Sequence, residues 1–244
     1  MSEYGPSTYG ERIAEVYDDL YQGLADLQPI VDALADLARG GRVLELGIGT
    51  GRIALPLAAR GIDIHGIDAS EAMVARLRAK EGGGKIPVTM GDFADVGVGG
   101  SYSLTFVVFN TFFALLSQED QVRCFRNVAQ QLTDDGVFLI EAFVPDLARF
   151  ARGQNTSATR VDTDSVVLDV TRHDPVNQRI VSQHVIITEG ETKLFPVQLR
   201  YAWPSELDLM AQLAGMQLRE RWGSWQRALF TAASTGHVSV YEKA

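Results

Sequence analysis

The chain has 244 residues, of which 46% are hydrophobic and 22% are charged, and these ordinary proportions exclude collagen-like and disordered proteins. Its 31 acidic and 22 basic residues give a formal net charge of −9, which disfavours a nucleic-acid partner because phosphate binding needs clustered Lys and Arg. Cys124 is the single cysteine, so an internal disulfide and a Cys-rich zinc site are excluded.

The N-terminal residues 1–40 are expected to form a helical cap. A helix from about residue 9 to residue 26 carries Tyr9, Tyr17 and Tyr21, whose spacings of eight and four place them on one helical face. A second helix is predicted over residues 28–39, because the glycine pair that follows is a stop signal.

Residues 41–145 alternate short apolar runs with helical patterns. Strands are predicted over residues 42–48, 62–68, 87–91, 104–109 and 137–143, and helices over residues 52–60, 71–80 and 117–132. Ser70 can cap the second of these helices, and Ser117 with Asp120 forms a capping box for the third. This alternation is typical of an open, mostly parallel sheet with helices on both faces.

The alternation of strand and helix patterns ends after Pro145. Residues 165–171, 179–187 and 193–202 predict three strands of a local antiparallel sheet, placed in an insertion over residues 146–202. Residues 203–244 are expected to complete the main sheet. There Ser205 and Asp208 suggest a capping box, Gly215 ends the helix, and strands are predicted over residues 217–222 and 237–242.

The most informative segment is the glycine-rich turn after the first predicted strand, Glu45-Leu46-Gly47-Ile48-Gly49-Thr50-Gly51. Such a turn lets a ligand approach the backbone at a helix N-terminus, although a plain structural turn is the alternative. The dinucleotide fingerprint G-x-G-x-x-G would need glycine at position 52, where the chain has Arg52. Asp68 closes the second strand, and its carboxylate suits the two hydroxyls of a ribose.

Four motifs in chain order resemble those of class I S-adenosylmethionine-dependent methyltransferases: residues 45–51, 66–70 with Met73, 91–93 and 109–113. The resemblance covers residues 40–143 closely. It implies an α/β fold with a Rossmann-like, doubly wound, seven-stranded sheet, mostly parallel with an antiparallel last strand, plus a small antiparallel β insertion after strand five. It also implies S-adenosyl-L-methionine as the cofactor, held by Tyr9, Glu45, Gly47, Gly49, Gly51, Asp68, Ala69, Met73, Asp92, Phe93, Phe109 and Asn110.

The chain is similar in particular to the small-molecule branch of this family, which includes N-methyltransferases of amino sugars. Members of this branch carry a Tyr-Asp helix, here Tyr17-Asp18, and a small sheet inserted after the fifth strand. Nucleic-acid amine methyltransferases instead have a [D/N/S]-P-P-[Y/F] motif, whereas Asn110 is followed here by Thr111 and no proline. The expected acceptor is therefore a small molecule, an amine or an aromatic compound, and not a nucleic acid.

Four residues are candidates for contact with that acceptor: His184, Tyr17, Arg200 and Glu141. His184 could orient or deprotonate it if its strand face looks down on the donor, and Tyr17 belongs to the helix that closes over the donor in the resembling family. Arg200 and Tyr201 lie on opposite faces of one strand, so one of them should face the pocket. Glu141 ends the fifth strand at the carboxyl edge, where ligands bind in this fold.

The expected reaction is an in-line displacement in which the acceptor attacks the sulfonium methyl and the protein supplies proximity and dehydration. Transfer to nitrogen is favoured over oxygen or carbon. A nicotinamide-dependent oxidoreductase and a non-catalytic S-adenosylmethionine-binding protein are the alternatives. No residue cluster has metal-ligand spacing, so no metal is predicted.

The expected setting is the cytoplasm, and no membrane partner is predicted. The longest apolar stretch, residues 104–116, is well short of the roughly 18 residues that span a bilayer. The acidic first thirty residues are also unlike a signal or transit peptide. The protein is expected to be a monomer or a homodimer.

Overall fold

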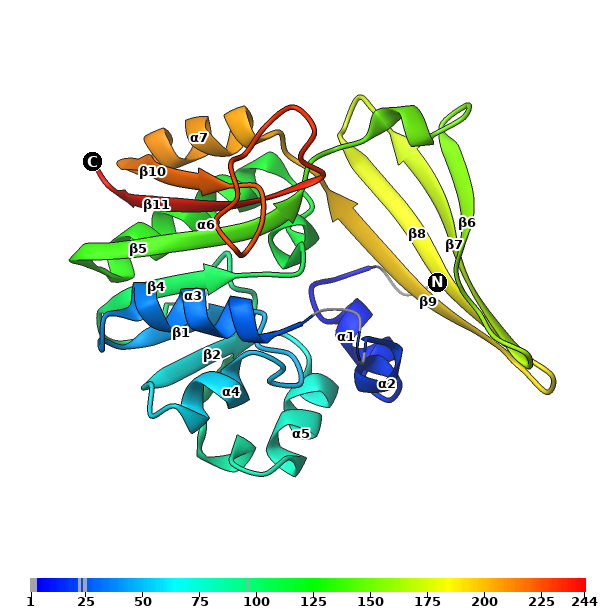
Figure 1. Cartoon of the computed structure of the whole chain (residues 1–244), viewed down its shortest axis with the longest axis horizontal. Helices are drawn as coiled ribbons and strands as arrows, with labels where there is room; N and C mark the ends of the chain where they lie inside the picture. The colour runs from blue at the N-terminus through cyan, green and yellow to red at the C-terminus, as the bar shows by residue number, and fades with distance from the viewer. Residues whose placement is uncertain (1–3, 22, 24–25, 96) are drawn as a thin grey trace.

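The structure is a computed structural model that describes residues 4–21, 23, 26–95 and 97–244. Two sheets dominate it, one of seven strands and one of four. Figure 1 shows the seven-stranded sheet with its helices on one side of the molecule and the four-stranded sheet standing apart on the other. Within the described residues, no helix is long and apolar enough to cross a membrane.

The seven-stranded sheet has the strand order β10-β11-β5-β4-β1-β2-β3. Neighbours among β1 to β5 are parallel, whereas β11 runs antiparallel to both β5 and β10. The predicted doubly wound α/β fold is therefore confirmed. The strands are β1 (Val43–Leu46), β2 (Ile64–Asp68), β3 (Val88–Met90), β4 (Tyr102–Val107), β5 (Leu132–Phe143), β10 (Met216–Trp222) and β11 (Gly236–Lys243).

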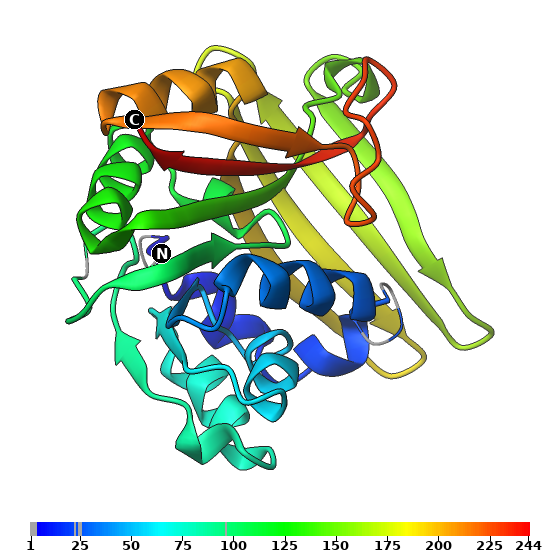
Figure 2. The same ribbon diagram turned by 60° about the vertical axis from the view of Figure 1, so that its left-hand side comes forward.

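Helices cover both faces of this sheet, because its strands are apolar on both sides. On β4, Leu104 and Phe106 pack into one core cluster with α3 and α4, whereas on β5, Phe138 packs into another with α6 and α7 (Figure 2). The helices are α3 (Gln28–Ala38), α4 (Ala54–Ala59), α5 (Glu71–Ala79), α6 (Gln118–Gln131) and α7 (Pro204–Leu213), with 3₁₀ turns η1 (Gly83–Lys85), η2 (Thr111–Ala114) and η3 (Leu147–Arg149).

The predicted capping box of α7 is wrong. The helix begins at Pro204, one residue earlier than Ser205, and no side chain caps it. Proline is well suited to the first helical position because it lacks the N–H that would otherwise need a partner there. Asp208 instead binds Arg221, 2.5 Å away, and Tyr241. The predicted N-caps at Ser70 and Ser117 do form.

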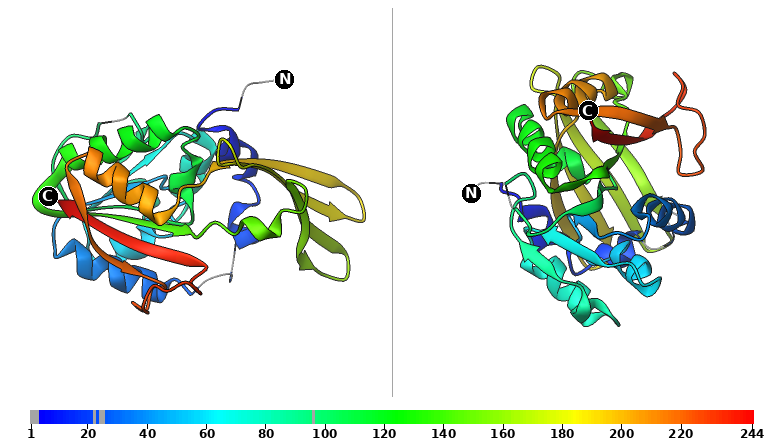
Figure 3. Two further views of the ribbon diagram at one scale, coloured as in Figure 1. Left: turned by 90° about the horizontal axis from the view of Figure 1, so that it is seen from above. Right: turned by 90° about the vertical axis from the view of Figure 1, so that its left-hand side faces the viewer.

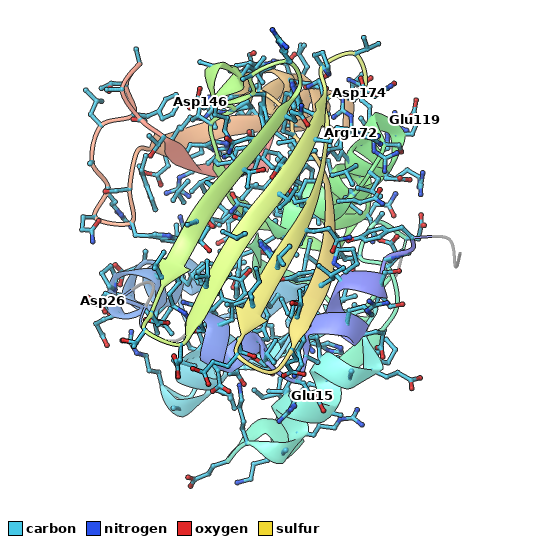
Figure 4. The ribbon with its side chains drawn as sticks, turned by 90° about the vertical axis from the view of Figure 1, so that its right-hand side faces the viewer. Glu15, Asp26, Glu119, Asp146, Arg172 and Asp174 are labelled. Carbon is cyan, nitrogen blue, oxygen red and sulfur yellow. The ribbon has the colours of Figure 1, made fainter. Side chains whose placement is uncertain are left out.

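The four-stranded sheet lies between β5 and α7 in the chain and is antiparallel throughout, in the order β6-β7-β8-β9. Its strands are β6 (Gln154–Val161), β7 (Ser165–Asp174), β8 (Arg179–Thr188) and β9 (Thr192–Arg200). Sequence analysis missed β6, because this edge strand is polar and almost wholly exposed and so lacks an apolar alternation. Figure 4 looks onto the outer face of the sheet, with Arg172 and Asp174 marking one end of β7.

The N-terminal segment forms two short helices, α1 (Thr8–Ile13) and α2 (Tyr17–Tyr21). The single helix predicted over residues 9–26 is therefore wrong, and its positions 22, 24 and 25 lie outside the described residues. Helices this short depend on packing and polar contacts. Ile13 and Ala14 are buried between Met73 of α5 and Phe195 of β9, so α1 lies between the two sheets (Figure 3).

Candidate active site

A cavity of about 320 Å³ lies at the carboxyl edge of the seven-stranded sheet. The chain leaves β1 toward β2 and β3 on one side and returns to β4 and β5 on the other, and such a switch point is where doubly wound sheets bind ligands. The turns after β1, β2 and β3, together with η2 and α1, form the wall. Nine predicted residues line it: Tyr9, Tyr17, Gly47, Gly49, Asp68, Ala69, Met73, Asp92 and Phe93.

The turn after β1 owes its shape to glycine. Gly47, Gly49 and Gly51 all have positive φ, between 53° and 79°, where other residues are strained. A Cβ on Gly47 would lie 2.6 Å from Cγ2 of Thr111, so the two walls of the cavity meet closely there. Gly51 does not line the cavity, because a Cβ there would lie 2.3 Å from Cδ1 of Leu77 in the packing beneath.

Asp68 joins the glycine turn to α5. Its Oδ2 accepts a hydrogen bond from the Gly49 N–H at 2.7 Å, and its Oδ1 accepts one from the Ser70 N–H at 2.8 Å. Burial raises the pKa of this carboxyl, and the two backbone hydrogen bonds oppose that effect. Each carboxylate oxygen can still accept another hydrogen bond, which is what a ribose with two hydroxyls needs.

The third motif supplies a second carboxyl group. Oδ1 of Asp92 accepts a hydrogen bond from the Ala94 N–H at 2.9 Å, which fixes the turn after β3. Burial also raises the pKa of Asp92. Its neighbour Phe93 is 9% exposed and presents an apolar surface to the same cavity. A carboxyl group beside a ring suits the amino group and the flat face of an adenine.

Three tyrosines of α1 and α2 lie close together, and two of them, Tyr9 and Tyr17, line the cavity. The hydroxyls of Tyr9 and Tyr21 lie 3.1 Å apart, and the rings of Tyr17 and Tyr21 are 4.8 Å apart. Burial raises the pKa of Tyr17 to about 12 and that of Tyr9 well above its usual value. These groups are therefore neutral hydroxyls near pH 7, able to donate and accept hydrogen bonds.

Polar contacts hold the two short helices over the cavity. Oε1 of Glu11 accepts hydrogen bonds from the Ser70 hydroxyl at 2.8 Å and from the backbone N–H of Ala72. Asp18 accepts a hydrogen bond from the hydroxyl of Thr50, in the glycine turn, and forms an ion pair with Lys80, both at 2.7 Å. Because α1 is tied to α5 and α2 to the glycine turn, the segment bends between them.

Three predicted cofactor residues lie behind the cavity wall. Glu45 is wholly buried, and its Oε2 has no hydrogen-bond partner among the described residues. Burial, and secondarily the Asp68 charge, raises the pKa of Glu45 well above its usual range. Phe109 and Asn110 both have positive φ, and Oδ1 of Asn110 accepts a hydrogen bond from the Phe143 N–H at 2.7 Å. Thr111, one residue later, lines the cavity instead.

Glu141 also lies behind the wall. Its Oε2 accepts a hydrogen bond from the Phe109 N–H at 2.5 Å. The backbone N–H groups of Phe109 and Asn110 both stabilise the charged form of this carboxyl group. Burial raises its pKa. The carboxyl group therefore holds the positive-φ turn after β4 and does not line the donor cavity.

The prediction that Arg200 faces the pocket is wrong. Its guanidinium points between β9, α6 and α7, where it forms a buried ion pair with Glu206 at 2.7 Å. It also donates hydrogen bonds to the side-chain oxygens of Gln121 and Gln178. Its strand neighbour Tyr201 instead lines a second cavity, at the base of the four-stranded sheet.

His184 lies on the inner face of the four-stranded sheet. Its Nδ1 contacts Oδ1 of Asp169 on β7, and Phe195 of β9 lies directly across from it. Phe195 packs on α1, so this face looks toward the N-terminal helices. Tyr21 adjoins the pair: burial raises its pKa, and the Asp169 charge adds to the effect. His184 itself does not line the donor cavity in this structure.

Sequence analysis missed much of the wall contributed by α1 and by the segment around η2. Gly10 allows α1 to approach α5, because a Cβ there would lie 2.5 Å from the Ser70 Cβ. Ser70 was assigned to the second motif and to a helix cap, which it forms, and Asp120 only to a capping box, in which its N–H donates to the Ser117 hydroxyl. The missed residues are Tyr4, Gly5, Pro6, Gly10, Ser70, Thr111, Ala114, Leu115, Leu116 and Asp120.

The cavity fits S-adenosylmethionine. The glycine turn leaves room for a ligand against the backbone, Asp68 offers free acceptor positions for a ribose, and Asp92 with Phe93 offers a polar and an apolar surface for a base. The cavity volume is that of a small-ligand site. Fold and cavity together define a nucleotide-binding α/β protein of the methyltransferase class.

Comparison with known proteins gives the family. Residues 43–136 match the methyltransferase domain family. The chain is 30% identical to the cypemycin N-terminal methyltransferase of a Streptomyces species, over 98% of each chain. It is 39% identical to the CcbJ methyltransferase of Streptomyces caelestis, with a TM-score of 0.93 over 99% of this chain and all of that one. The chain belongs to the family of S-adenosylmethionine-dependent methyltransferases.

The fold also extends to more distant structures. An amino pentose methyltransferase from Micromonospora echinaspora, CalS10, was solved with S-adenosylmethionine bound. It matches 94% of this chain and 97% of its own length with a TM-score of 0.71, at 18% identity. At this identity the match shows that the architecture is shared, including a chain of nearly the same extent.

Proposed function

We propose that this enzyme methylates an amine nitrogen of a small molecule bound between the donor cavity and the inner face of the four-stranded sheet. The observation that carries the proposal is the charge of the cavity. Asp68, Asp92 and Asp120 line it, and none of its described lining residues is Lys or Arg. Asp68 and Asp92 serve the donor, so Asp120 is the lining carboxyl group left for the acceptor. An anionic, aromatic-walled site favours cationic ligands, and an ammonium group is the common resting form of an amine.

The relatives support transfer to nitrogen. The cypemycin enzyme is named for methylation of an N-terminus, and CalS10 is an amino pentose methyltransferase. Both acceptors carry an amine on an otherwise different framework. An amine is also the acceptor that needs least from the protein, since loss of one proton frees its lone pair for attack.

The acceptor's apolar part has a place of its own. A second cavity, of about 440 Å³, lies where the four-stranded sheet leaves β5 and is lined by Phe143, Phe150, Ile180 and Tyr201. Phe143 connects it with η2, because its ring lies 5.0 Å from that of Phe113. We assign this aromatic cavity to the acceptor framework and the four-stranded sheet to the role of a lid.

The chain's own residues orient the reactants and move one proton. S-adenosylmethionine, when bound, supplies a methyl group on a sulfonium, which is already electrophilic. Tyr9 and Tyr17 line the donor cavity and offer neutral hydroxyls that orient the amine. Asp169 holds Nδ1 of His184, so Nε2 is the ring nitrogen left to accept the proton that the amine gives up. α1 and α2 keep water out.

The remaining predicted residues act on the donor side. Gly47, Gly49, Asp68, Ala69, Met73, Asp92 and Phe93 are proposed to contact the donor directly. Glu45, Gly51, Phe109 and Asn110 are proposed to shape the turns around it from behind. Glu141 and Arg200 are proposed to hold the structure on the acceptor side rather than to touch substrate.

A panel assay tests the proposal. The purified enzyme is incubated with S-adenosylmethionine and separate amines, phenols and indoles, and product is identified by mass spectrometry together with S-adenosylhomocysteine release. We expect methylation among amines and none among phenols. His184→Gln should lower kcat, whereas His65→Gln, on β2, should leave kcat unchanged. Exclusive turnover of phenols or indoles would contradict the proposal.

A further inference from the structure

Arg52 occupies an unusual position beside the donor cavity. It follows the glycine turn directly, and its guanidinium lies over the ring of Phe109, with Cζ 4.4 Å from the ring centroid. Its charge also affects the Tyr17 hydroxyl. Burial raises the pKa of Tyr17 to about 12, and the nearby positive charge of Arg52 opposes part of that rise. Arg52 therefore lies between the turn after β1, the turn after β4 and α2.

The charge of Arg52 is not matched by an acidic side chain. Within the described part of the chain, no carboxylate lies within ion-pair distance of its guanidinium. The neighbouring cation, Lys80, is already bound by Asp18 at 2.7 Å and by the Thr50 carbonyl oxygen at 2.9 Å. A positive group held against an aromatic ring without a counter-ion is ready to receive an anion.

The anion can come from the donor itself. S-adenosylmethionine carries two positive groups, a sulfonium and an ammonium, and one carboxylate. The donor cavity is lined by three carboxyl groups and, among its described residues, by no cation, so it suits the first two and not the third. A cavity of about 380 Å³ adjoins it across Tyr17, which lines both. Arg52 and Lys80 line this adjoining cavity together with Asp18, which pairs with Lys80, and Asp19.

We propose that Arg52 binds the carboxylate of the donor's methionine part, and that Tyr17 lies beside that contact. Arg52 then selects donors that carry this carboxylate over donors that lack it. The inference rests on methyl transfer from S-adenosylmethionine and is independent of the acceptor. It also gives a reason for arginine at the position where a dinucleotide-binding turn has its third glycine.

Calorimetric titration without acceptor tests the inference. Wild type, Arg52→Met and Arg52→Lys are each titrated with S-adenosylmethionine and with its decarboxylated analogue, which lacks the carboxylate and is otherwise the same molecule. We expect wild type to bind the carboxylated donor about tenfold to a hundredfold more tightly, as a charge-assisted pair provides. Arg52→Met should lose that preference while retaining its affinity for the decarboxylated analogue, and Arg52→Lys should retain part of it.

Lys80→Met is the matched control, because it removes the other cation of the same cavity. It should change binding of both ligands by the same factor, since Lys80 serves the Asp18 contact. If the wild-type protein binds S-adenosylmethionine and its decarboxylated analogue equally tightly, the inference is overturned by that measurement alone. An Arg52→Met protein that loses both ligands alike would also overturn it, because Arg52 would then be structural. Neither outcome depends on which acceptor is methylated.

Discussion

The two walls of the active-site cleft are built in opposite ways. On the donor side, the groups that meet the cavity come from short segments, and backbone geometry places them: Gly49 and Ser70 both donate their N–H groups to Asp68. On the acceptor side, side chains far apart in the chain are brought together, as Tyr21 is with Asp169 and His184. The first arrangement is fixed by local sequence and the second by the packing of a separate sheet.

This difference teaches where each half is vulnerable. A change on the donor side should act on donor binding, because the residues there are also the proposed donor contacts. A change on the acceptor side should act first on stability or on the position of the four-stranded sheet. Arg200 is an example, because it belongs to β9 and yet is bound by α6 and α7 of the other half.

Arg200→Met should have the largest effect and should separate the two walls. The Arg200–Glu206 ion pair is buried, with side-chain exposures of 7% and 16%, so removing the cation leaves an uncompensated carboxylate. Breaking such a pair costs about 3–5 kcal/mol in the free energy of unfolding. Urea denaturation should show this loss, while the donor Kd of the folded variant stays within about twofold of wild type.

Arg160→Met is the control for that measurement, because Arg160 pairs with Asp162 on the exposed edge of the same sheet. Its effect on the unfolding midpoint should be far smaller, as expected for an exposed pair. An Arg200→Met protein as stable as Arg160→Met would show that the four-stranded sheet is not anchored through this contact.

The pH dependence of the free energy of unfolding tests a buried histidine, His237, on β11 of the seven-stranded sheet. His237 is 1% exposed, and burial, with the Arg221 charge second, lowers its pKa to about 4. A histidine in the unfolded chain has a pKa near 6.5. As the pH falls from there, the unfolded chain binds a proton at His237 that the native chain does not bind. Stability should therefore decrease between about pH 6.5 and pH 4, by at most about 3 kcal/mol from this group.

His237→Gln is expected to flatten that part of the curve. Gln cannot titrate, and its amide can still reach Ser239, which hydrogen-bonds Nδ1 of His237 at 2.8 Å. Urea denaturation of both proteins at several pH values measures the difference. Parallel curves for the two proteins would mean that His237 is not the group responsible.

Asp68→Ala probes the backbone-built wall. The change removes the acceptor of two backbone hydrogen bonds and the expected contact with the donor ribose. Losing charge-assisted hydrogen bonds costs about 1.5–3 kcal/mol, which is roughly a 10- to 150-fold loss of S-adenosylmethionine affinity by calorimetry. Asp63→Ala, at an exposed ion pair with Arg42 just before β2, should bind the donor as wild type does. Unchanged affinity in folded Asp68→Ala would exclude the ribose role.

The contrast between the walls also explains how far the sequence could predict this protein. The seven-stranded sheet and the donor turns follow from local patterns, since apolar runs, glycines at positive φ and Asp68 all lie within a few residues of one another. Eight of the twelve cofactor residues predicted from the resemblance line the cavity, and Tyr17, predicted as an acceptor contact, lines it as well.

The acceptor wall could not be predicted in the same way. The sequence shows that Arg200 and Tyr201 point to opposite faces, but which face is buried depends on α6 and α7. Likewise, the break between α1 and α2 has no proline or glycine to mark it. It follows from contacts of Glu11 and Asp18 with residues 32 to 61 positions away, which no local pattern records.

The smallest expected effect lies where the two walls meet, at the tyrosines of α1 and α2. Tyr9→Phe, Tyr17→Phe and Tyr21→Phe each remove one hydroxyl and keep the ring, so packing with Ile13 and Phe195 is preserved. At least one change should lower kcat/KM about tenfold, or about 1.4 kcal/mol, with little change in apo thermal stability. Tyr102→Phe, on β4 away from the cavity, is the control. Three variants with wild-type kinetics would reduce α1 and α2 to packing elements, and the acceptor wall would then consist of the four-stranded sheet alone.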